Sequence, residues 1–138
     1  MLFIKFIGKV TNNFPKKTYF CLINLYAMKI TIVSGARPNF MKIAPITRAI
    51  KAAQEVGKKI SYRLIYTGRQ DDTSLDASLF SDLDMKKPDG YLGVSGHDQS
   101  EVTAAIMLAF EKELNTHPAQ VVLVVDDLTA TMSCSIVA

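Results

Sequence analysis

The sequence predicts an α/β fold in which a mainly parallel sheet is flanked by helices. Residues 29–34 and 119–125 are continuous, β-branched apolar runs, a composition typical of strands buried on both faces. Between them, apolar residues recur at helical spacing over residues 40–53 and 99–114. Strands that alternate with helices favour a parallel sheet with right-handed crossovers, so we expect a Rossmann-like arrangement.

The predicted elements follow one another without an intervening linker or internal repeat. In order they are a strand at 29–34, a helix at 40–53, a strand at 62–66, a helix at 75–83, a short strand at 91–94, a helix at 99–114, a strand at 119–125 and a helix at 129–137. Gly57 should end the first helix, because glycine favours the left-handed turn found there. Asp71, Asp72 and Ser74 are candidate N-caps for the second helix, and Ser100 for the third.

The first 27 residues differ in composition from the rest of the chain. They carry four lysines and no acid, and an apolar tract at 18–27 follows Lys16 and Lys17, as in a signal peptide. This tract is too short to span a bilayer, and it has no clean amphipathic stripe for a membrane surface. We therefore expect residues 1–27 to be an N-terminal extension outside the core, with Met28 as an alternative start. Residues 28–138 are expected to form an incomplete Rossmann-like domain.

Composition narrows the classes of function. A chain of 138 residues with 49% hydrophobic and 21% charged residues is typical of one globular domain. The net charge of +3 comes from the lysines of the extension, so the near-neutral core does not indicate nucleic-acid binding. Cys21 and Cys134 have no metal-ligand spacing, and His97 and His117 are isolated, so no metal site is expected. A reduced, cytoplasmic setting follows from this cysteine usage, with Cys134 an inert packed thiol.

A candidate phosphate site lies directly after the first core strand. Gly35 permits a tight turn, and Pro38 suits the first turn of a helix, where its missing N–H is not needed. The helix start offers free backbone N–H groups and a dipole that favours an anion. Arg37 can bind two phosphate oxygens at once, and Lys42 adds a point charge. The alternative is a turn with no ligand, and the segment matches neither the dinucleotide nor the Walker pattern.

Three loops are expected to meet at the carboxyl ends of the strands, where parallel sheets bind ligands. They are residues 34–39, 67–73 and 126–131. Asp127 follows the last strand and opens a helix, so it is either a catalytic acid or an N-cap, a role for which Asp126 competes. The two adjacent carboxylates should raise each other's pKa. Gln70 lies in a polar loop that is either part of the site or a solvated turn.

Four blocks of the sequence resemble the non-hydrolysing UDP-N-acetylglucosamine 2-epimerases. VSGARPNFMKIAPI is similar to the family's opening strand and its G-T-R-P-E-x-x-K-x-x-P signature. YTGRQDDTSLDASLF resembles the T-G-Q-H-Y-D-x-x-M block, and GHDQSEVTAAIMLAFEKEL resembles the helix that begins near Q-T. VVLVVDDLTATMSCSIVA resembles V-x-V-x-G-D-x-x-S/T-T-x-A. The blocks occur in the family's order and cover nearly all of residues 28–138.

The resemblance implies a function for the parent protein. The family has two domains arranged as in GT-B glycosyltransferases, with a UDP-sugar in the cleft. It converts UDP-GlcNAc to UDP-ManNAc by eliminating UDP and adding it back with inversion at C2, without a cofactor. By position, Arg37 and Lys42 match the Arg and Lys near the nucleotide sugar, and Asp127 matches the active-site Asp. The full-length parent is expected to be a homodimer with no membrane or nucleic-acid partner.

The chain also departs from the family pattern. Ala36 stands in place of Thr, Asn39 of Glu, Gln70 of His, and Asp126 of the Gly before the key Asp. The chain ends after the Asp127 block, before the family's later acidic residues, its catalytic His and its second domain. We therefore expect this polypeptide to be inactive alone. The alternatives are a non-catalytic nucleotide-sugar or phosphate-binding module and a glycosyltransferase fragment.

Overall fold

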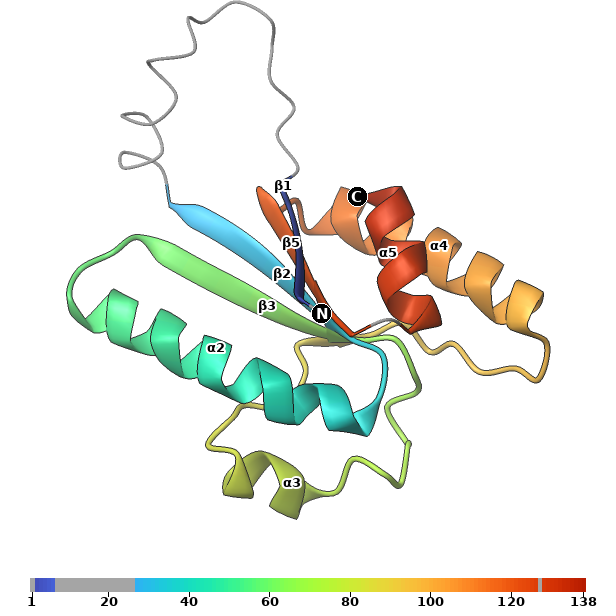
Figure 1. The fold of residues 1–138 in the computed structure, drawn as a ribbon, viewed down its shortest axis with the longest axis horizontal. Coiled ribbons are helices and arrows are strands. Elements are labelled where there is room, and N and C mark those ends of the chain that lie inside the picture. The colour runs from blue at the N-terminus through green and yellow to red at the C-terminus, as the bar shows by residue number, and fades with distance from the viewer. Residues whose placement is uncertain (1, 7–26, 127) are drawn as a thin grey trace, which may run out of the picture.

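A computed structural model describes residues 2–6, 27–126 and 128–138 and has helices on both faces of one sheet (Figure 1). In chain order the elements are β1 (Leu2–Phe6), β2 (Met28–Ser34), α2 (Arg37–Glu55), β3 (Ile60–Tyr66), α3 (Ala77–Asp82), β4 (Gly90–Tyr91), α4 (Gln99–Thr116), β5 (Val121–Val125) and α5 (Thr129–Val137). The predicted α/β class and the alternation of strands with helices are confirmed.

The sheet has the strand order β1-β5-β2-β3-β4. Strand β2 pairs in parallel with β3 from Met28↔Ile60 to Ser34↔Tyr66, and with β5 from Ile30↔Val121 to Val33↔Val124. Strand β4 extends the parallel part beyond β3. The first core strand is therefore central and later strands are added on either side, as in doubly wound folds.

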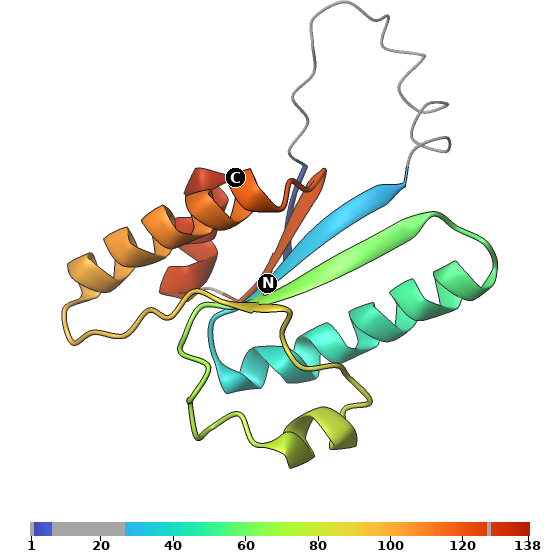
Figure 2. The ribbon, with the colours of Figure 1, turned by 180° about the vertical axis from the view of Figure 1, so that it is seen from behind.

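Two apolar cores lie on opposite faces of the sheet, with α2 and α3 on one side and α4 and α5 on the other (Figures 1 and 2). On the first side Phe40 and Ile43 of α2 pack with Ile32 and Leu64 of the sheet. The second core contains Val33, Ile106, Phe110, Val122, Val124, Ala130 and Cys134. Because both faces are covered, β5 has no alternation of polar and apolar residues.

The helix ends explain where the chain turns. Gly57, with a φ of 81°, follows α2 and takes the left-handed conformation expected there. Asp76 caps α3 by accepting a hydrogen bond from the Leu79 N–H, and Asp98 caps α4 by accepting from the Ser100 N–H. The candidate caps Asp71, Asp72, Ser74 and Ser100 were therefore wrong. In each case a nearby Asp in extended backbone takes the role instead.

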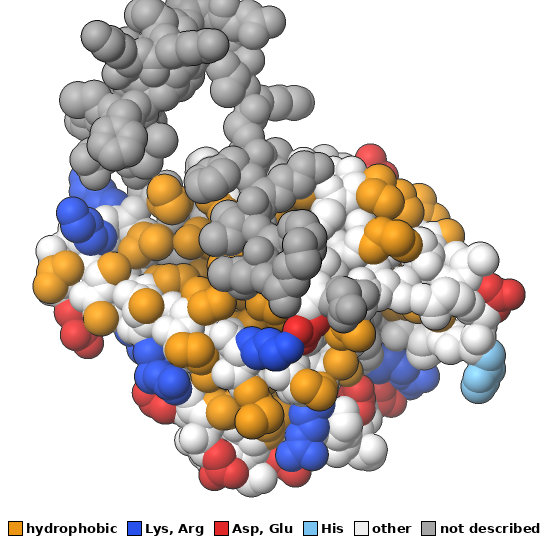
Figure 3. Space-filling view, in the orientation of Figure 1, with side chains coloured by type: hydrophobic (Ala, Val, Ile, Leu, Met, Phe, Trp, Pro, Cys, Tyr) orange, Lys and Arg blue, Asp and Glu red, His pale blue; other side chains and the backbone are white. Residues whose placement is uncertain are grey.

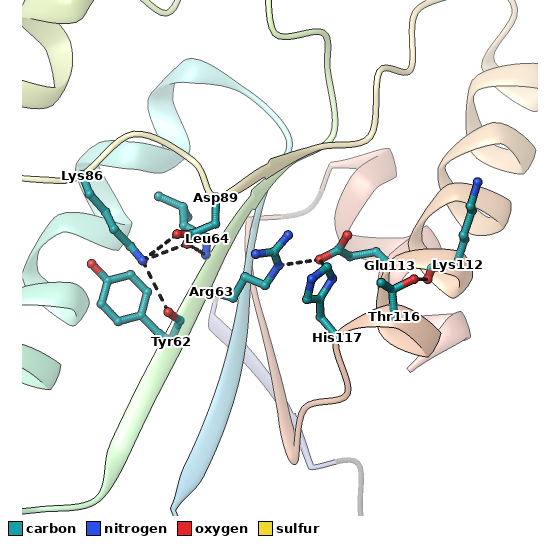
Figure 4. A network of polar contacts seen from close by, with 9 residues as sticks. All are labelled: Tyr62, Arg63, Leu64, Lys86, Asp89, Lys112, Glu113, Thr116 and His117. Atoms are coloured by element: carbon teal, nitrogen blue, oxygen red, sulfur yellow. Dashed lines mark hydrogen bonds and ion pairs between the residues drawn. The ribbon is translucent and has the colours of Figure 1, made fainter.

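A network of polar contacts ties β3 to its neighbours (Figure 4). Arg63 of β3 donates through Nε to Glu113 Oε1 of α4 at 2.6 Å, and His117 lies 3.1 Å from the same oxygen. On the other side, Asp89 accepts from the Leu64 N–H at 2.7 Å and from Lys86. These contacts hold α4 and the segment before β4 against the central sheet.

Two sequence-based expectations differ from the structure. The predicted strand at 91–94 is shorter and comprises Gly90–Tyr91, because Gly93, with a φ of 70°, leaves extended geometry. Residues 1–27 were expected to lie outside the core, yet Leu2–Phe6 pairs antiparallel with β5 as a fifth strand. The division of the chain at Met28 itself stays a prediction.

Candidate functional site

A cavity of about 570 Å³ lies at the carboxyl ends of β2, β3 and β5. It is lined by Gly35, Ala36, Tyr66, Thr67, Gly68, Arg69, Asp71, Asp72, Thr73, Val94, Ser95, Gly96, Val102, Ile106, Leu128, Thr129 and Ala130. The three loops expected to meet at this edge of the sheet thus do so. The loop at 94–96 and the start of α4 also line the cavity. They were not predicted to do so, because the strand before them, β4, has only two residues and leaves little pattern in the sequence.

Gly35 lies where the β2–α2 turn approaches α5. A Cβ built at this glycine would be 2.6 Å from the Cβ of Ala130, much closer than two carbon atoms pack. The glycine is therefore needed for close packing of the turn against α5. Its structural role is defined by this contact, and its predicted role in substrate binding stays a prediction.

Asn39 occupies the backbone amides of the turn after β2. Its Oδ1 accepts hydrogen bonds from the N–H groups of Gly35 and Ala36 at 2.8 and 2.9 Å. The Asn39 side chain is itself 1% exposed. The expectation of free amides at this turn was therefore wrong for these two groups, because a side chain three residues into the helix turns back to bind them.

Asp126 forms the second half of this polar cluster. It accepts hydrogen bonds from Asn39 Nδ2 at 2.6 Å and from the Lys42 ammonium, and its backbone φ is 68°. The pKa of Asp126 lies below its ordinary value, chiefly because Lys42 donates to it, while partial burial opposes the shift. The expectation of a raised pKa was therefore wrong for Asp126. Asp126 is thus an ion-pair partner and not the cap of α5, whose N-cap is Leu128 without a side-chain bond.

The other predicted site residues are placed as follows. Arg37 and Pro38 are exposed at the start of α2, Lys42 is exposed one turn later, and Gln70 is exposed in the loop after β3. None of these four is among the residues that line the cavity. Asp127, the predicted catalytic acid, lies outside the described residues.

The positive charge of Arg37 acts on a nearby carboxylate. The pKa of Asp76 is lowered mainly by the hydrogen bond from the Leu79 N–H, and Arg37 contributes a smaller electrostatic part. The N-terminal ends of α2 and α3 are therefore close enough for their charges to interact. Arg37 remains at the surface, on the helix that follows Gly35 and Ala36.

The loop after β3 supplies most of the charged groups in the cavity wall. Arg69 binds Asp71 through two hydrogen bonds of 2.9 and 2.7 Å, so its charge is balanced locally. Tyr66 donates to Asp72 at 2.6 Å. This bond lowers the pKa of Asp72, whereas burial and then the bond raise the pKa of Tyr66. This pair could not be predicted from the sequence, because Tyr66 is not distinguished from the other apolar residues of its strand.

The cavity wall combines hydroxyl groups, carboxylates and apolar carbon. The hydroxyls come from Thr67, Thr73, Ser95 and Thr129. Asp71 and Asp72 supply acceptors, and Val94, Val102, Ile106, Leu128 and Ala130 supply apolar surface. Such a lining suits a polar, uncharged ring with several hydroxyl groups, which needs both donors and acceptors.

The described part of the chain offers neither a metal centre nor a membrane-spanning helix. No group of three or more His, Cys, Asp or Glu residues there could hold a metal ion. No helix in that part is long and apolar enough to cross a membrane. Cys134 is fully buried, and burial raises the pKa of its thiol to about 12, as expected of a packed and unreactive cysteine.

A parallel sheet that carries helices on both faces and a cavity at the carboxyl ends of its strands defines a Rossmann-like α/β domain. A family model described as UDP-N-acetylglucosamine 2-epimerase matches residues 52–138. The chain therefore belongs to the UDP-N-acetylglucosamine 2-epimerase family.

Individual relatives agree with this assignment. A UDP-N-acetylglucosamine 2-epimerase from Methanocaldococcus jannaschii is 27% identical over 111 residues, which are 80% of this chain and 29% of the relative. A UDP-2,3-diacetamido-2,3-dideoxy-D-glucuronate 2-epimerase from Pseudomonas aeruginosa is 28% identical over 111 residues, 80% of this chain and 30% of the relative. The chain thus spans less than a third of the length of these relatives.

Solved structures show the same fold. The M. jannaschii UDP-GlcNAc 2-epimerase in complex with UDP-GlcNAc and UDP superimposes with a TM-score of 0.70 at 27% identity, over 80% of this chain and 29% of that one. The UDP-GlcNAc 2-epimerase from Neisseria meningitidis bound to UDP-GlcNAc gives 0.65 at 25% identity, over 80% and 29%. The Rossmann-like architecture is therefore shared with part of each relative.

Proposed function

We propose that this chain is the N-terminal part of a UDP-N-acetylglucosamine 2-epimerase, which inverts C2 of UDP-GlcNAc to give UDP-ManNAc. The observation that carries the proposal is the family match over residues 52–138. The P. aeruginosa relative is named for a different UDP-sugar, so the nucleotide is the firmer part of the substrate assignment. We further propose a cytoplasmic protein whose full-length parent is a homodimer.

The cavity supports a UDP-sugar as the ligand class. Its hydroxyls and carboxylates suit the hydroxyl groups of a sugar ring, and its apolar surface suits the ring carbons. Arg37 and Lys42, on the helix that follows Gly35, are proposed to contact the diphosphate. Lys42 already binds Asp126, so a diphosphate has to share or replace that carboxylate.

Asp127 is proposed to take part in the proton transfers of the reaction. In such a mechanism the C2 proton is removed as UDP leaves, and a proton is returned to the opposite face as UDP adds back. A carboxylate can act as the base or acid for these steps when it lies at the ligand end of the sheet. No cofactor is needed, because no electrons are exchanged with a second molecule.

We also propose that the 138-residue chain is inactive alone, because it spans about 29% of its relatives. The test is to incubate the purified chain with UDP-GlcNAc in deuterated water and follow UDP release and deuterium at C2. We expect neither. Clear turnover would show that the catalytic groups are all within this chain and would overturn the proposal of inactivity.

A non-catalytic nucleotide-sugar-binding module is the second candidate. It is favoured by the cavity, whose hydroxyl groups and apolar surface could bind a sugar ring whether or not a catalytic acid is present. The substitution Asp127→Asn in the complete protein separates the two candidates. An epimerase should lose turnover while UDP-sugar binding, measured by calorimetry, persists. A wild-type complete protein that binds UDP-GlcNAc but never exchanges its C2 proton would favour the binding module.

A further inference from the structure

The outer edge of β5 is covered by a strand from the other end of the chain. Residues Leu2–Phe6 pair antiparallel with Val121–Val125, from Leu2↔Val125 to Phe6↔Val121. All other strand pairs of the described sheet are parallel. Strand β1 is therefore an addition to a doubly wound sheet and not one of its repeating units.

If the edge of β5 that β1 covers were exposed, it would favour strand pairing between molecules. Val121–Val125 reads Val-Val-Leu-Val-Val, with no charge and no proline, and all five residues are at most 6% exposed. An apolar, uncharged strand of this kind pairs readily with strands of other molecules when its backbone edge is free. Without β1, the outer N–H and C=O groups of β5 would be at the surface.

The strand order indicates that the outer edge of β5 is also suited to a different strand. The core strands lie in the order β5-β2-β3-β4, which matches the first four strands of a doubly wound sheet. In that order the strand after α5 is placed beside β5, which is the position that β1 now occupies. The surface under β1 is thus a strand-docking edge by topology as well as by composition.

We propose that β1 is an edge-protecting strand, which occupies the strand-docking edge of β5 and prevents β5 from pairing with a second copy of this chain. The segment has features that suit an edge. It is only five residues long, and it contains Lys5 between apolar residues, whereas β5 contains no charge. The protected partner is therefore the core sheet, and the excluded partner is another molecule of the same protein.

Proline substitutions in the full-length chain test the proposal. In an antiparallel ladder, successive residues direct their amides alternately toward the partner strand and away from it. One of Phe3→Pro and Ile4→Pro therefore removes a ladder bond, and the other is its matched control. Hydrogen exchange of the β5 amides and the mass in solution by light scattering are measured for both variants and for wild type.

We expect one proline variant to exchange its β5 amides about tenfold faster than wild type and to self-associate as concentration rises, while the other behaves like wild type. Amides of β3 serve as the internal control for folding. Unchanged β5 exchange and an unchanged mass in both variants would overturn the proposal.

If the proline variants fail to fold, a chain in which β1 is joined to β5 by a disulfide provides a second test. Lys5 is paired with Val122 in the strand register, so Lys5→Cys with Val122→Cys, in a Cys21→Ser background, should form a disulfide on mild oxidation. The oxidised chain should resist self-association on warming better than its reduced form. Failure to form the disulfide, or equal self-association of both forms, would contradict the proposal.

Discussion

At the scale of single residues, Asp126 combines a left-handed backbone conformation with an ion pair to Lys42. Its φ of 68° lies in the left-handed region, where the family pattern has a glycine and where Asp is tolerated better than most side chains. The aspartate also adds a carboxylate, which Asn39 and Lys42 bind. Asn39 stands where the family has Glu, so the acidic group of this cluster is carried by the strand end and not by the helix.

The pairing of Asp126 predicts a contribution to acid sensitivity. Its folded-state pKa is lowered, so its stabilising effect is present above the unfolded-state value of about 3.9 and is lost as pH falls through the folded-state value. We expect Asp126→Asn, which tolerates the same φ, to be less stable than wild type at pH 7 and to lose less stability between pH 5 and pH 3. Urea unfolding at several pH values measures this.

The control for this prediction is Lys42→Met, which keeps most of the side-chain length and removes the charge. Its pH dependence should approach that of Asp126→Asn, because each variant removes the same ion pair. If Asp126→Asn and wild type lose stability in parallel as the pH falls, the Lys42–Asp126 pair does not contribute to acid sensitivity.

At the scale of elements, the contact between the β2–α2 turn and α5 sets the geometry of the cavity. Gly35→Ala would place a Cβ 2.6 Å from that of Ala130, so we expect a loss of about 1–3 kcal/mol in unfolding free energy from overpacking. Ala130→Gly alone should cost about 1 kcal/mol by lowering helix propensity. Chemical unfolding of both variants gives these values.

The double variant Gly35→Ala with Ala130→Gly distinguishes packing from backbone effects. Removing the Ala130 methyl group makes room for the new one, so the double variant should be more stable than the sum of the single losses predicts. Strictly additive losses would mean that Gly35 is needed for its backbone conformation and not for contact with α5.

The elements show which features could be predicted from sequence. The strands at 28–34 and 121–125 and the helix at 99–116 lie within a few residues of prediction, because long apolar runs and helical spacing depend on burial alone. The folding back of Asn39 onto two turn amides, and its bond to Asp126, could not be predicted. The first depends on the conformation of one side chain, which helical spacing does not specify, and the second joins residues that are 87 positions apart in the sequence.

At the scale of the whole molecule, the surface carries no single dominant charge on the face in view. Figure 3 shows lysine, arginine and acidic side chains interspersed among apolar ones on this face. Exposed apolar groups include Met132 and Ile136, one helical turn apart on α5.

Strand β1 and the remainder of an epimerase should compete for one edge of the sheet. In a chimera that joins this chain to the part of the M. jannaschii relative beyond the matched 111 residues, the strand after α5 is expected beside β5. We therefore predict that the amides of Leu2–Phe6 are protected from hydrogen exchange in the 138-residue chain and lose that protection in the chimera. The β5 amides should stay protected in both, because one strand replaces the other. Protected β1 amides in a folded chimera would show that the following strand is placed elsewhere, and the topological argument for a shared edge would then fail.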